Sequence, residues 1–136
     1  MKILIASEAE WIRNQVRGAF VAPGQGVIEV TRGRDVGATV TAENPDLVIL
    51  DMQIGNMGGV AVAIELHLDA EEGRVPEVPI LLLLDREADR FLAKRAAAGE
   101  VLVKPLDAGT LRRAARRLLA TTTLAATPSG AGPALR

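Results

Sequence analysis

The sequence predicts an α/β fold, a doubly wound (βα)5 sandwich with a five-stranded parallel sheet. A chain of 136 residues, of which 49% are hydrophobic, suffices for one domain with one core and not for two. Short aliphatic runs alternate with longer segments of helical period, which is typical of a parallel sheet covered on both faces. Several of these runs are apolar at nearly every position, as the central strands of such a sheet are.

Five aliphatic runs are the predicted strands, at residues 2–6, 27–31, 46–50, 79–84 and 101–104. The first, third and fourth are almost entirely apolar, which predicts central strands buried on both sides. Glu29 interrupts the second run and predicts that this strand lies at an edge of the sheet.

Five segments of helical period are the predicted helices, at residues 9–20, 34–43, 59–70, 86–98 and 108–120. The second is assigned mainly from its place in the alternation, because Gly37 and β-branched residues lower its helix propensity. Helical spacing predicts a buried stripe on each of the other four helices. These stripes are Trp11 or Ile12, Val16 and Phe20 on the first; Val60, Ile64 and Leu68 on the third; Ala88, Phe91, Leu92 and Ala96 on the fourth; and Leu111, Ala115, Leu118 and Leu119 on the fifth. Gly99 is the predicted end of the fourth helix.

Composition narrows the class of protein. The formal net charge of -1 favours neither nucleic acid nor an anionic membrane as the principal partner. The absence of cysteine excludes disulfides and thiol chemistry and fits a reducing compartment. The first apolar run is too short for a signal peptide, and no later run approaches membrane-spanning length. We therefore expect a cytoplasmic protein with one domain over residues 1–120 and a flexible tail, rich in small residues, over 121–136.

Charged residues follow several of the predicted strands. Glu8, Asp51, Asp85 and Lys104 all lie at predicted carboxyl ends, where a sheet of this kind binds or reacts. Two carboxylates are suitable ligands for a hard cation such as Mg2+, and a lysine beside them suits an anion. An exposed Asp51 with these neighbours would serve as a nucleophile towards a phosphoryl group.

These motifs resemble the receiver domain of bacterial two-component response regulators over roughly residues 1–120. "PDLVILDMQIGNMGG" is similar to the third strand and acceptor loop of that family, and places Asp51 at the phosphoacceptor and Gly59 at the loop glycine. "VLVKP" places Lys104 at the phosphate-contacting lysine, before a proline whose peptide bond is cis in the family. "KILIASE" lies where the family has a strand ending in an acidic pair.

The resemblance implies a flavodoxin-like fold, a Mg2+ cofactor and a phosphoryl group passed to Asp51. The donor would be a histidine kinase, a phosphotransfer protein or a small acyl phosphate. Glu8, Asp51 and the backbone carbonyl of Gln53 would hold the metal, with Ser7 reaching it through a water molecule.

The sequence departs from the family at the metal site and at the switch. Ser7 replaces one acid of the pair, which should weaken the metal site. Leu84 replaces the hydroxyl residue that binds the phosphoryl group, and Val101 replaces the aromatic residue that moves with it. Both moving parts of the usual switch are therefore substituted.

The loop after Asp51 and the position after Leu84 also differ. Gly55, Asn56 and Gly58 replace the usual loop residues and should loosen the loop. Asp85 stands where a small residue is usual, and its charge would repel a bound phosphate or a hydrolytic water.

Each candidate residue also has a purely structural interpretation. Asp51 would then cap its loop and Lys104 would be a solvated strand end. Glu8 would be an acidic residue stabilised by the dipole at the amino end of the first predicted helix. His67 is interpreted as a structural or surface residue, and Trp11 as an anchor of its helix.

Arginines at i, i+1, i+4 and i+5 line one side of the last predicted helix, at Arg112, Arg113, Arg116 and Arg117. A solvated face is the simpler interpretation. The alternative is a surface for an acidic partner or a second copy, since receiver domains commonly signal or dimerise through their fourth and fifth helices. Without interleaved aromatic residues the stripe does not favour direct nucleic-acid binding.

Two functions therefore compete. In the first, a stand-alone receiver accepts a phosphoryl group on Asp51 within a phosphorelay and is no enzyme in the usual sense. In the second, a pseudo-receiver acts as an interaction module without phosphorylation, which Ser7 and Leu84 favour. A phosphohydrolase is less well supported, because "DMQIG" lacks a second acid to act as general acid. A dinucleotide enzyme is disfavoured by the absence of a glycine-rich turn after the first strand.

Overall fold

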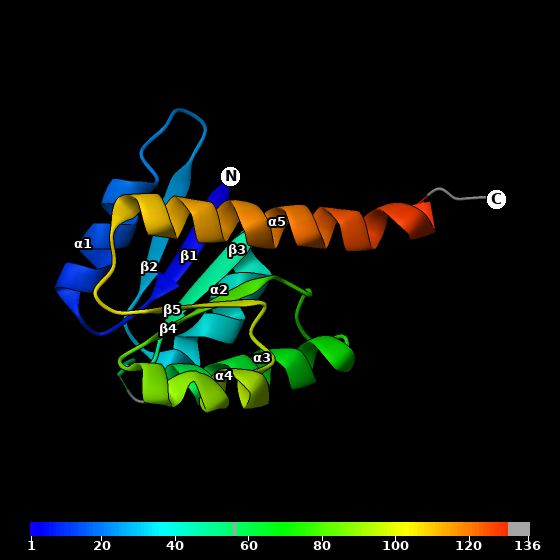
Figure 1. The fold of residues 1–136 in the computed structure, drawn as a ribbon. Coiled ribbons are helices and arrows are strands. Elements are labelled where there is room, and N and C mark those ends of the chain that lie inside the picture. Colours follow the sequence, from blue (N-terminus) through cyan, green and yellow to red (C-terminus); the bar gives the residue numbers. More distant parts are fainter. Residues whose placement is uncertain (56, 131–136) are drawn as a thin grey trace.

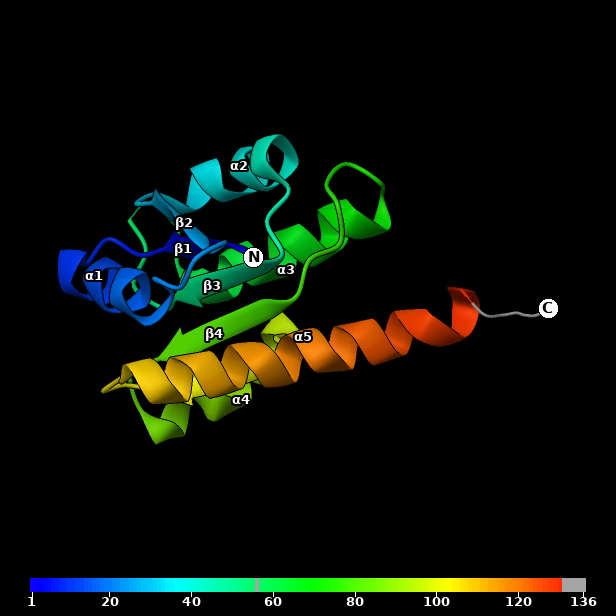
Figure 2. The same ribbon diagram turned by 90° about the horizontal axis from the view of Figure 1, so that it is seen from above.

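The computed structural model describes residues 1–55 and 57–130, and they form an α/β sandwich (Figures 1 and 2). The strands are β1 (Lys2–Ala6), β2 (Gly26–Val30), β3 (Leu47–Asp51), β4 (Ile80–Leu84) and β5 (Glu100–Val103). The helices are α1 (Glu10–Ala19), α2 (Val36–Glu43), α3 (Gly59–Glu71), α4 (Arg90–Ala96) and α5 (Ala108–Gly130). Two short 3-10 turns, η1 (Gly33–Asp35) and η2 (Glu87–Asp89), precede α2 and α4.

The five strands form one parallel sheet in the order β2-β1-β3-β4-β5. The predicted fold class is therefore confirmed, and β2, which contains Glu29, lies at an edge as predicted. Because the order reverses between β1 and β3, the carboxyl ends of these strands meet at the switch point of the sheet, where folds of this type place their sites.

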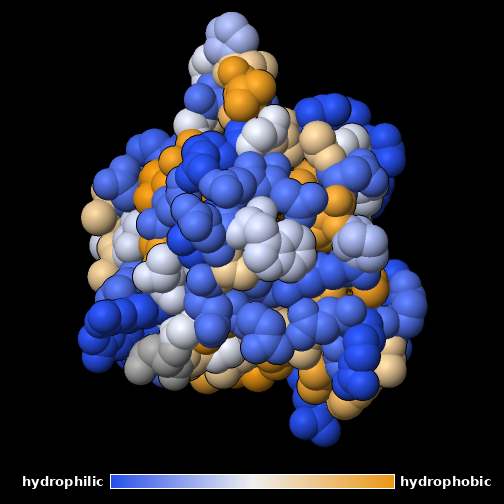
Figure 3. Space-filling model, turned by 90° about the vertical axis from the view of Figure 1, so that its left-hand side faces the viewer, coloured by the Kyte–Doolittle hydropathy of each residue, from blue (hydrophilic) through white to orange (hydrophobic). Residues whose placement is uncertain are grey.

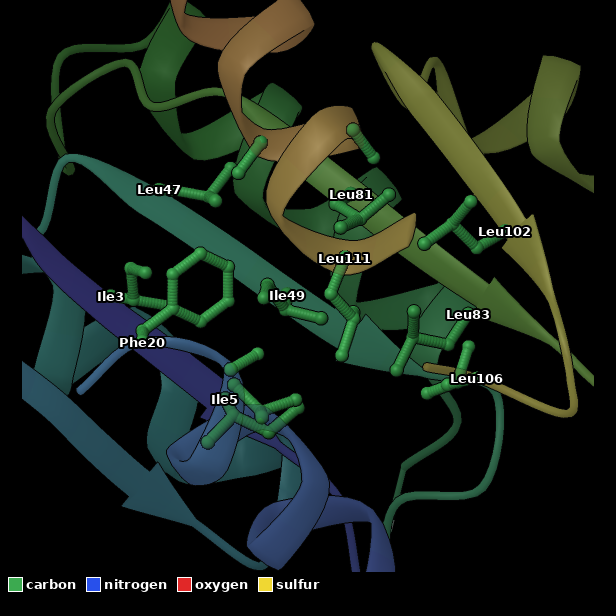
Figure 4. Packing of buried hydrophobic residues seen from close by; sticks show 14 of the residues in the cluster. Ile3, Ile5, Phe20, Leu47, Ile49, Leu81, Leu83, Leu102, Leu106 and Leu111 are labelled. Carbon is green, nitrogen blue, oxygen red and sulfur yellow. The ribbon is translucent and has the colours of Figure 1, made fainter. Parts of the chain in front are cut away.

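Two hydrophobic clusters fill the two faces of the sheet. Alternate residues along each strand point to opposite faces, so Ile3 and Ile5 join the cluster under α1 and α5, while Leu4 joins the one under α2, α3 and α4. Figure 4 shows the first cluster, in which Leu111 of α5 packs over Ile49. Burial on both sides explains why the central strands are apolar at nearly every position, apart from Lys2 and Asp51 at strand ends.

The buried face of α1 agrees only partly with the prediction. Ile12, Val16 and Phe20 are buried as expected. Trp11 is 54% exposed, so the interpretation of Trp11 as an anchor is wrong. A stripe already filled by Ile12 and Val16 leaves the neighbouring position facing solvent.

The predicted stripe of α3 is wrong at two of its three positions, whereas Val60 is partly buried and packs against the core. Ile64 and Leu68 are 38% and 54% exposed, while Val62, Ala63 and Leu66 are buried. Small residues let this other face approach the sheet: a Cβ on Gly59 would lie 2.2 Å from the carbonyl oxygen of Asp51. Hydrophobic size alone therefore selected the wrong side of the helix.

The fourth helix also differs from its prediction. Phe91 is 60% exposed, whereas Ala93 and Ala96 are buried. The helix ends at Ala97, which has a left-handed φ of 52°, and not at Gly99. Gly99 instead makes room for α5, because a Cβ there would lie 2.4 Å from Leu118.

The last helix is longer than predicted. Leu111, Ala115 and Leu118 are buried as expected, but the helix continues to Gly130 and not to residue 120. No glycine or proline interrupts residues 110–127, so nothing in the sequence ends the helix earlier. The first part of the predicted tail is thus helical, and residues 131–136 lie outside the described residues. Flexibility of the tail stays a prediction.

Candidate functional site

The carboxyl ends of the strands gather the predicted charged residues at one side of the molecule. Figure 2 shows β3 and β4 pointing towards this side, and Figure 3 views it directly. Its surface is mostly hydrophilic, with hydrophobic patches between the polar side chains. Asp51 is the last residue of β3, and Ser7, Asp85 and Lys104 directly follow β1, β4 and β5.

The carboxylate of Asp51 is fully buried and accepts hydrogen bonds on both oxygens. Ser7 Oγ donates to Oδ2 over 2.6 Å, and Lys104 Nζ donates to Oδ1 over 2.5 Å. The backbone N–H of Gln53 also donates to Oδ1, over 3.1 Å. The prediction of an exposed aspartate is wrong, because these three groups close over it. A buried carboxylate needs such partners to remain charged.

Lys104 joins two carboxylates. Its Nζ lies 2.5 Å from Asp51 Oδ1 and 2.8 Å from Asp85 Oδ1, and the peptide bond to Pro105 is cis, as the resemblance implied. Burial lowers the pKa of Lys104, but the hydrogen bonds with Asp51 and Asp85 outweigh burial and raise that pKa above its ordinary value. The lysine therefore keeps its positive charge at neutral pH.

The bond between Asp85 and Gln53 was not predicted from the sequence. Gln53 Nε2 donates to Asp85 Oδ2 over 2.8 Å, while Lys104 holds Oδ1. Burial raises the pKa of Asp85, but the bonds from Lys104 and Gln53 lower it further, so the pKa lies below its ordinary value. Only the position of Asp85 after a central strand signalled its place in the site.

Ser7 is tied into the site from several sides. Its hydroxyl accepts from the N–H of Ala9 over 3.0 Å while donating to Asp51. Its carbonyl accepts from Arg13 over 2.9 Å. A serine hydroxyl supplies one proton and two lone pairs, so these two bonds use the proton and one lone pair of the buried Ser7 Oγ.

Several oxygen atoms near Asp51 are of the kind that coordinates Mg2+, although they are fewer than a full acidic pair would supply. Glu8 is exposed beside the site, and its N–H donates to the carbonyl of Gln53 over 3.2 Å, which leaves that oxygen a second lone pair. Within residues 1–55 and 57–130, no group of three or more His, Asp or Glu side chains is placed to hold a metal. Mg2+ commonly uses one or two carboxylates and keeps several waters, so carboxylate and carbonyl oxygens such as these are of the type that it prefers.

Leu84 is the last residue of β4, directly before Asp85, whereas Val101 is the second residue of β5 and pairs with Leu82. Leu84 is fully buried in the cluster under α3 and α4, and Val101 packs against the same cluster. Neither side chain has a hydrogen-bonding group, so neither can bind a phosphoryl oxygen.

The loop after β3 is hydrogen-bonded to the segment that follows β2. Gly33 N–H donates to the carbonyl of Gly55 over 2.9 Å, and Gly55 N–H donates to that of Thr31 over 3.2 Å. A Cβ on Gly33 would lie 2.6 Å from Met57, so the two segments are closely packed. Asn56 lies outside the described residues, and the loosening expected from Gly55, Asn56 and Gly58 stays a prediction.

The arginine stripe is exposed at all four positions, Arg112, Arg113, Arg116 and Arg117. Arg117 pairs with Glu100 over 3.1 Å. Arg112 donates to the carbonyl of Ala19 over 3.4 Å, which fixes α5 to α1. On α3, His67 Nε2 lies 2.9 Å from the carbonyl oxygen of Ala97, which agrees with a structural role for this histidine.

Comparison with known proteins identifies the class that this fold and site define. The family description "Response regulator receiver domain" matches residues 3–116. The chain is 29% identical over 119 residues to protein PilH of Pseudomonas aeruginosa, covering 88% of this chain and 98% of PilH. It is 30% identical over 119 residues to sporulation initiation phosphotransferase F of Bacillus subtilis, covering 87% and 93%.

A solved structure supports the same fold. The chemotaxis protein CheY4 of Vibrio cholerae superposes with a TM-score of 0.73 at 24% identity, covering 86% of this chain and 97% of that chain. The chain therefore belongs to the response regulator receiver domains of two-component signalling. Receiver domains of this family generally bind Mg2+ at an acidic site. No helix in residues 1–55 and 57–130 is both long and apolar enough to cross a membrane.

Proposed function

We propose that this chain accepts a phosphoryl group on Asp51 as a receiver in a phosphorelay. The observation that carries the proposal is the contact of Asp51 with Lys104, at 2.5 Å, where the central strands of the sheet end. A structural cap would need only backbone donors, whereas this carboxylate is held by a cation that also suits a phosphoryl group.

The transfer uses groups already at the site. A carboxylate oxygen of Asp51 forms a bond to phosphorus, and the bond from phosphorus to the donor breaks, with its electron pair leaving on the donor. Acetyl phosphate would release acetate in this step. Ser7 holds Oδ2 through one hydrogen bond, whereas Oδ1 has two donors, so Oδ2 is the oxygen more easily freed to react. Lys104 offsets the charge of the phosphoryl oxygens.

Glu8, Asp51 and the carbonyl of Gln53 would hold Mg2+, with Ser7 reaching it through a water molecule. When bound, the metal would neutralise negative charge on the phosphoryl group. The loss of an acid at Ser7 leaves two carboxylates, so we expect weaker metal binding than a full acidic pair would give.

The natural donor would be a histidine kinase or a phosphotransfer protein in the cytoplasm. The exposed arginines of α5 offer a surface for an acidic downstream partner or for a second copy of the chain. The net of four positive charges over residues 106–136, five arginines against Asp107, supports this use of the last helix.

The second candidate function is a pseudo-receiver that binds partners without being phosphorylated. The complete burial of Asp51 favours it, because a buried carboxylate cannot reach phosphorus until one of its hydrogen-bond donors moves away. Leu84 favours it as well, because it cannot signal the arrival of a phosphoryl group through a hydroxyl.

Intact-mass measurement after incubation with acetyl phosphate separates the two functions. A Mg2+-dependent gain of one phosphoryl group, absent from Asp51→Asn, is expected for the acceptor. No gain, when a conventional receiver treated in parallel is modified, would overturn the proposal in favour of the pseudo-receiver.

A further inference from the structure

The carboxylate of Asp85 is bound as a small anion would be. Lys104 Nζ holds Oδ1 and Gln53 Nε2 holds Oδ2, each over 2.8 Å. These donors come from different segments, the end of β5 and the loop after β3. Together they form an anion-binding position whose occupant is a side chain of the protein itself.

The same lysine is the cation that a phosphoryl group on Asp51 would use. Lys104 Nζ lies within hydrogen-bonding distance of both Asp51 and Asp85, so an added phosphoryl group and the Asp85 carboxylate compete for one ammonium group. Phosphorylation adds about one further negative charge to a site that already has two carboxylates for one lysine. The repulsion falls on Asp85, whose side chain is only partly buried and is not enclosed by the core.

We propose that Asp85 is a built-in competitor, which occupies the anion position beside Lys104 and Gln53 and so slows phosphorylation of Asp51. This inference rests on the proposed acceptor function. It assigns a regulatory role to a residue that neither holds the metal nor reacts.

Removal of the carboxylate should speed the reaction. With Asp85→Ala, Lys104 keeps its bond to Asp51 but loses the one to Asp85, and Gln53 Nε2 loses its acceptor, so both can donate to the incoming group. We expect phosphorylation by acetyl phosphate to be about tenfold faster. Asp85→Asn removes the charge but keeps one acceptor oxygen, so a smaller increase is expected. Glu87→Ala is the matched control, because it removes a nearby exposed carboxylate that pairs with Arg90 and not with Lys104.

The test compares these variants by intact mass over time, with Mg2+, after circular dichroism has shown that each is folded. A faster Asp85→Ala with an unchanged Glu87→Ala supports the inference. An Asp85→Ala that is unchanged or slower overturns it, and so does an equal gain in Glu87→Ala, which would indicate a general charge effect.

A second measurement keeps the inference testable if Asp51 is never phosphorylated. Binding of inorganic phosphate is followed by the fluorescence of Trp11, the single tryptophan of the chain, and by the NMR signal of the Lys104 ammonium group. About tenfold tighter phosphate binding by Asp85→Ala would show that the carboxylate occupies an anion site even though the proposed function fails. Equal affinity of the two proteins would overturn the inference.

Discussion

Two neighbouring regions of the sheet differ in chemistry. The acceptor region, defined by Ser7, Asp51 and Lys104, is a closed hydrogen-bonded network around a buried charge. The switch region, defined by Leu84 and Val101, is hydrophobic and continues the core under α3 and α4. Under the proposed function, the groups for phosphoryl transfer are retained, while the positions expected to report it are occupied by packed hydrophobic residues.

This difference has an energetic basis. A buried carboxylate without its cation is strongly unfavourable, so Asp51 and Lys104 are expected to depend on each other. A leucine at position 84 gains free energy from burial that a threonine would forgo. The acceptor region is therefore stabilised by pairing and the switch region by the hydrophobic effect.

The largest expected effect comes from breaking the acceptor region. Lys104→Ala leaves Asp51 buried without its cation, and should lower the free energy of unfolding by about 3 kcal/mol in urea denaturation. The exposed Lys94→Ala is the control and should stay within about 0.5 kcal/mol of the parent protein. Adding Asp51→Asn to Lys104→Ala should restore stability, whereas strictly additive effects would show that the two side chains are not coupled.

Restoring a hydroxyl in the switch region should be slightly less costly. Leu84→Thr removes hydrophobic volume and buries a polar group, so a loss of about 2 kcal/mol in the free energy of unfolding is expected. Leu84→Ile keeps the volume and should cost less than about 1.5 kcal/mol. If thermal and chemical denaturation show that Leu84→Thr is as stable as Leu84→Ile, position 84 is not part of the packed core.

A missing acid can be added to the acceptor region. Ser7→Asp should bind Mg2+ about tenfold more tightly, because ligand charge raises affinity for this cation. Without metal the variant should be less stable than the parent, since a second carboxylate would face Asp51. Fluorescence titration of Trp11 measures the affinity, with Ser7→Asn as a neutral control. Equal affinity in all three proteins would exclude this position from the metal site.

The smallest effect concerns the Asp85–Lys104 pair. Because the pKa of Asp85 is lowered in the folded state, its contribution to folding stability is complete above about pH 4. That contribution is lost as the pH falls through the lower pKa of the folded state. Because the pKa of Lys104 is raised in the folded state, its contribution to folding stability is complete below about pH 10 and is lost at higher pH.

The stability difference between the parent and Asp85→Asn should therefore be flat across neutral pH and shrink towards both extremes. We expect the difference in the free energy of unfolding to be roughly 0.5 kcal/mol, because this ion pair is partly exposed. Denaturation measured across the pH range checks it, and a difference that changes steeply near pH 7 would contradict the assignment.

The sheet and the main site contact could be predicted from the sequence for physical reasons. Strands buried on both faces need apolar residues throughout, and parallel strands bring their carboxyl ends to one edge. These rules were sufficient to bring Asp51 and Lys104 together.

Other features depend on information that periodicity lacks. The buried face of α3 is set by Gly59 and Ala63, whose small size permits close packing, so a search for large apolar residues chose Ile64 instead. The bond between Gln53 and Asp85 depends on side-chain conformations that bring two loops together. Hydrogen-bond donors from three segments bury Asp51, which the pattern of its own strand does not indicate.

The most direct test of the contrast between the two regions is a pair of amide NMR spectra, recorded with Mg2+ before and after acetyl phosphate is added. We predict shifts of the signals of Ser7 and Glu8, of the loop after Asp51, and of Lys104, with little change across α4 and β5. Shifts as large in α4 and β5 as around Asp51 would contradict this account, because the switch region would then respond despite Leu84 and Val101.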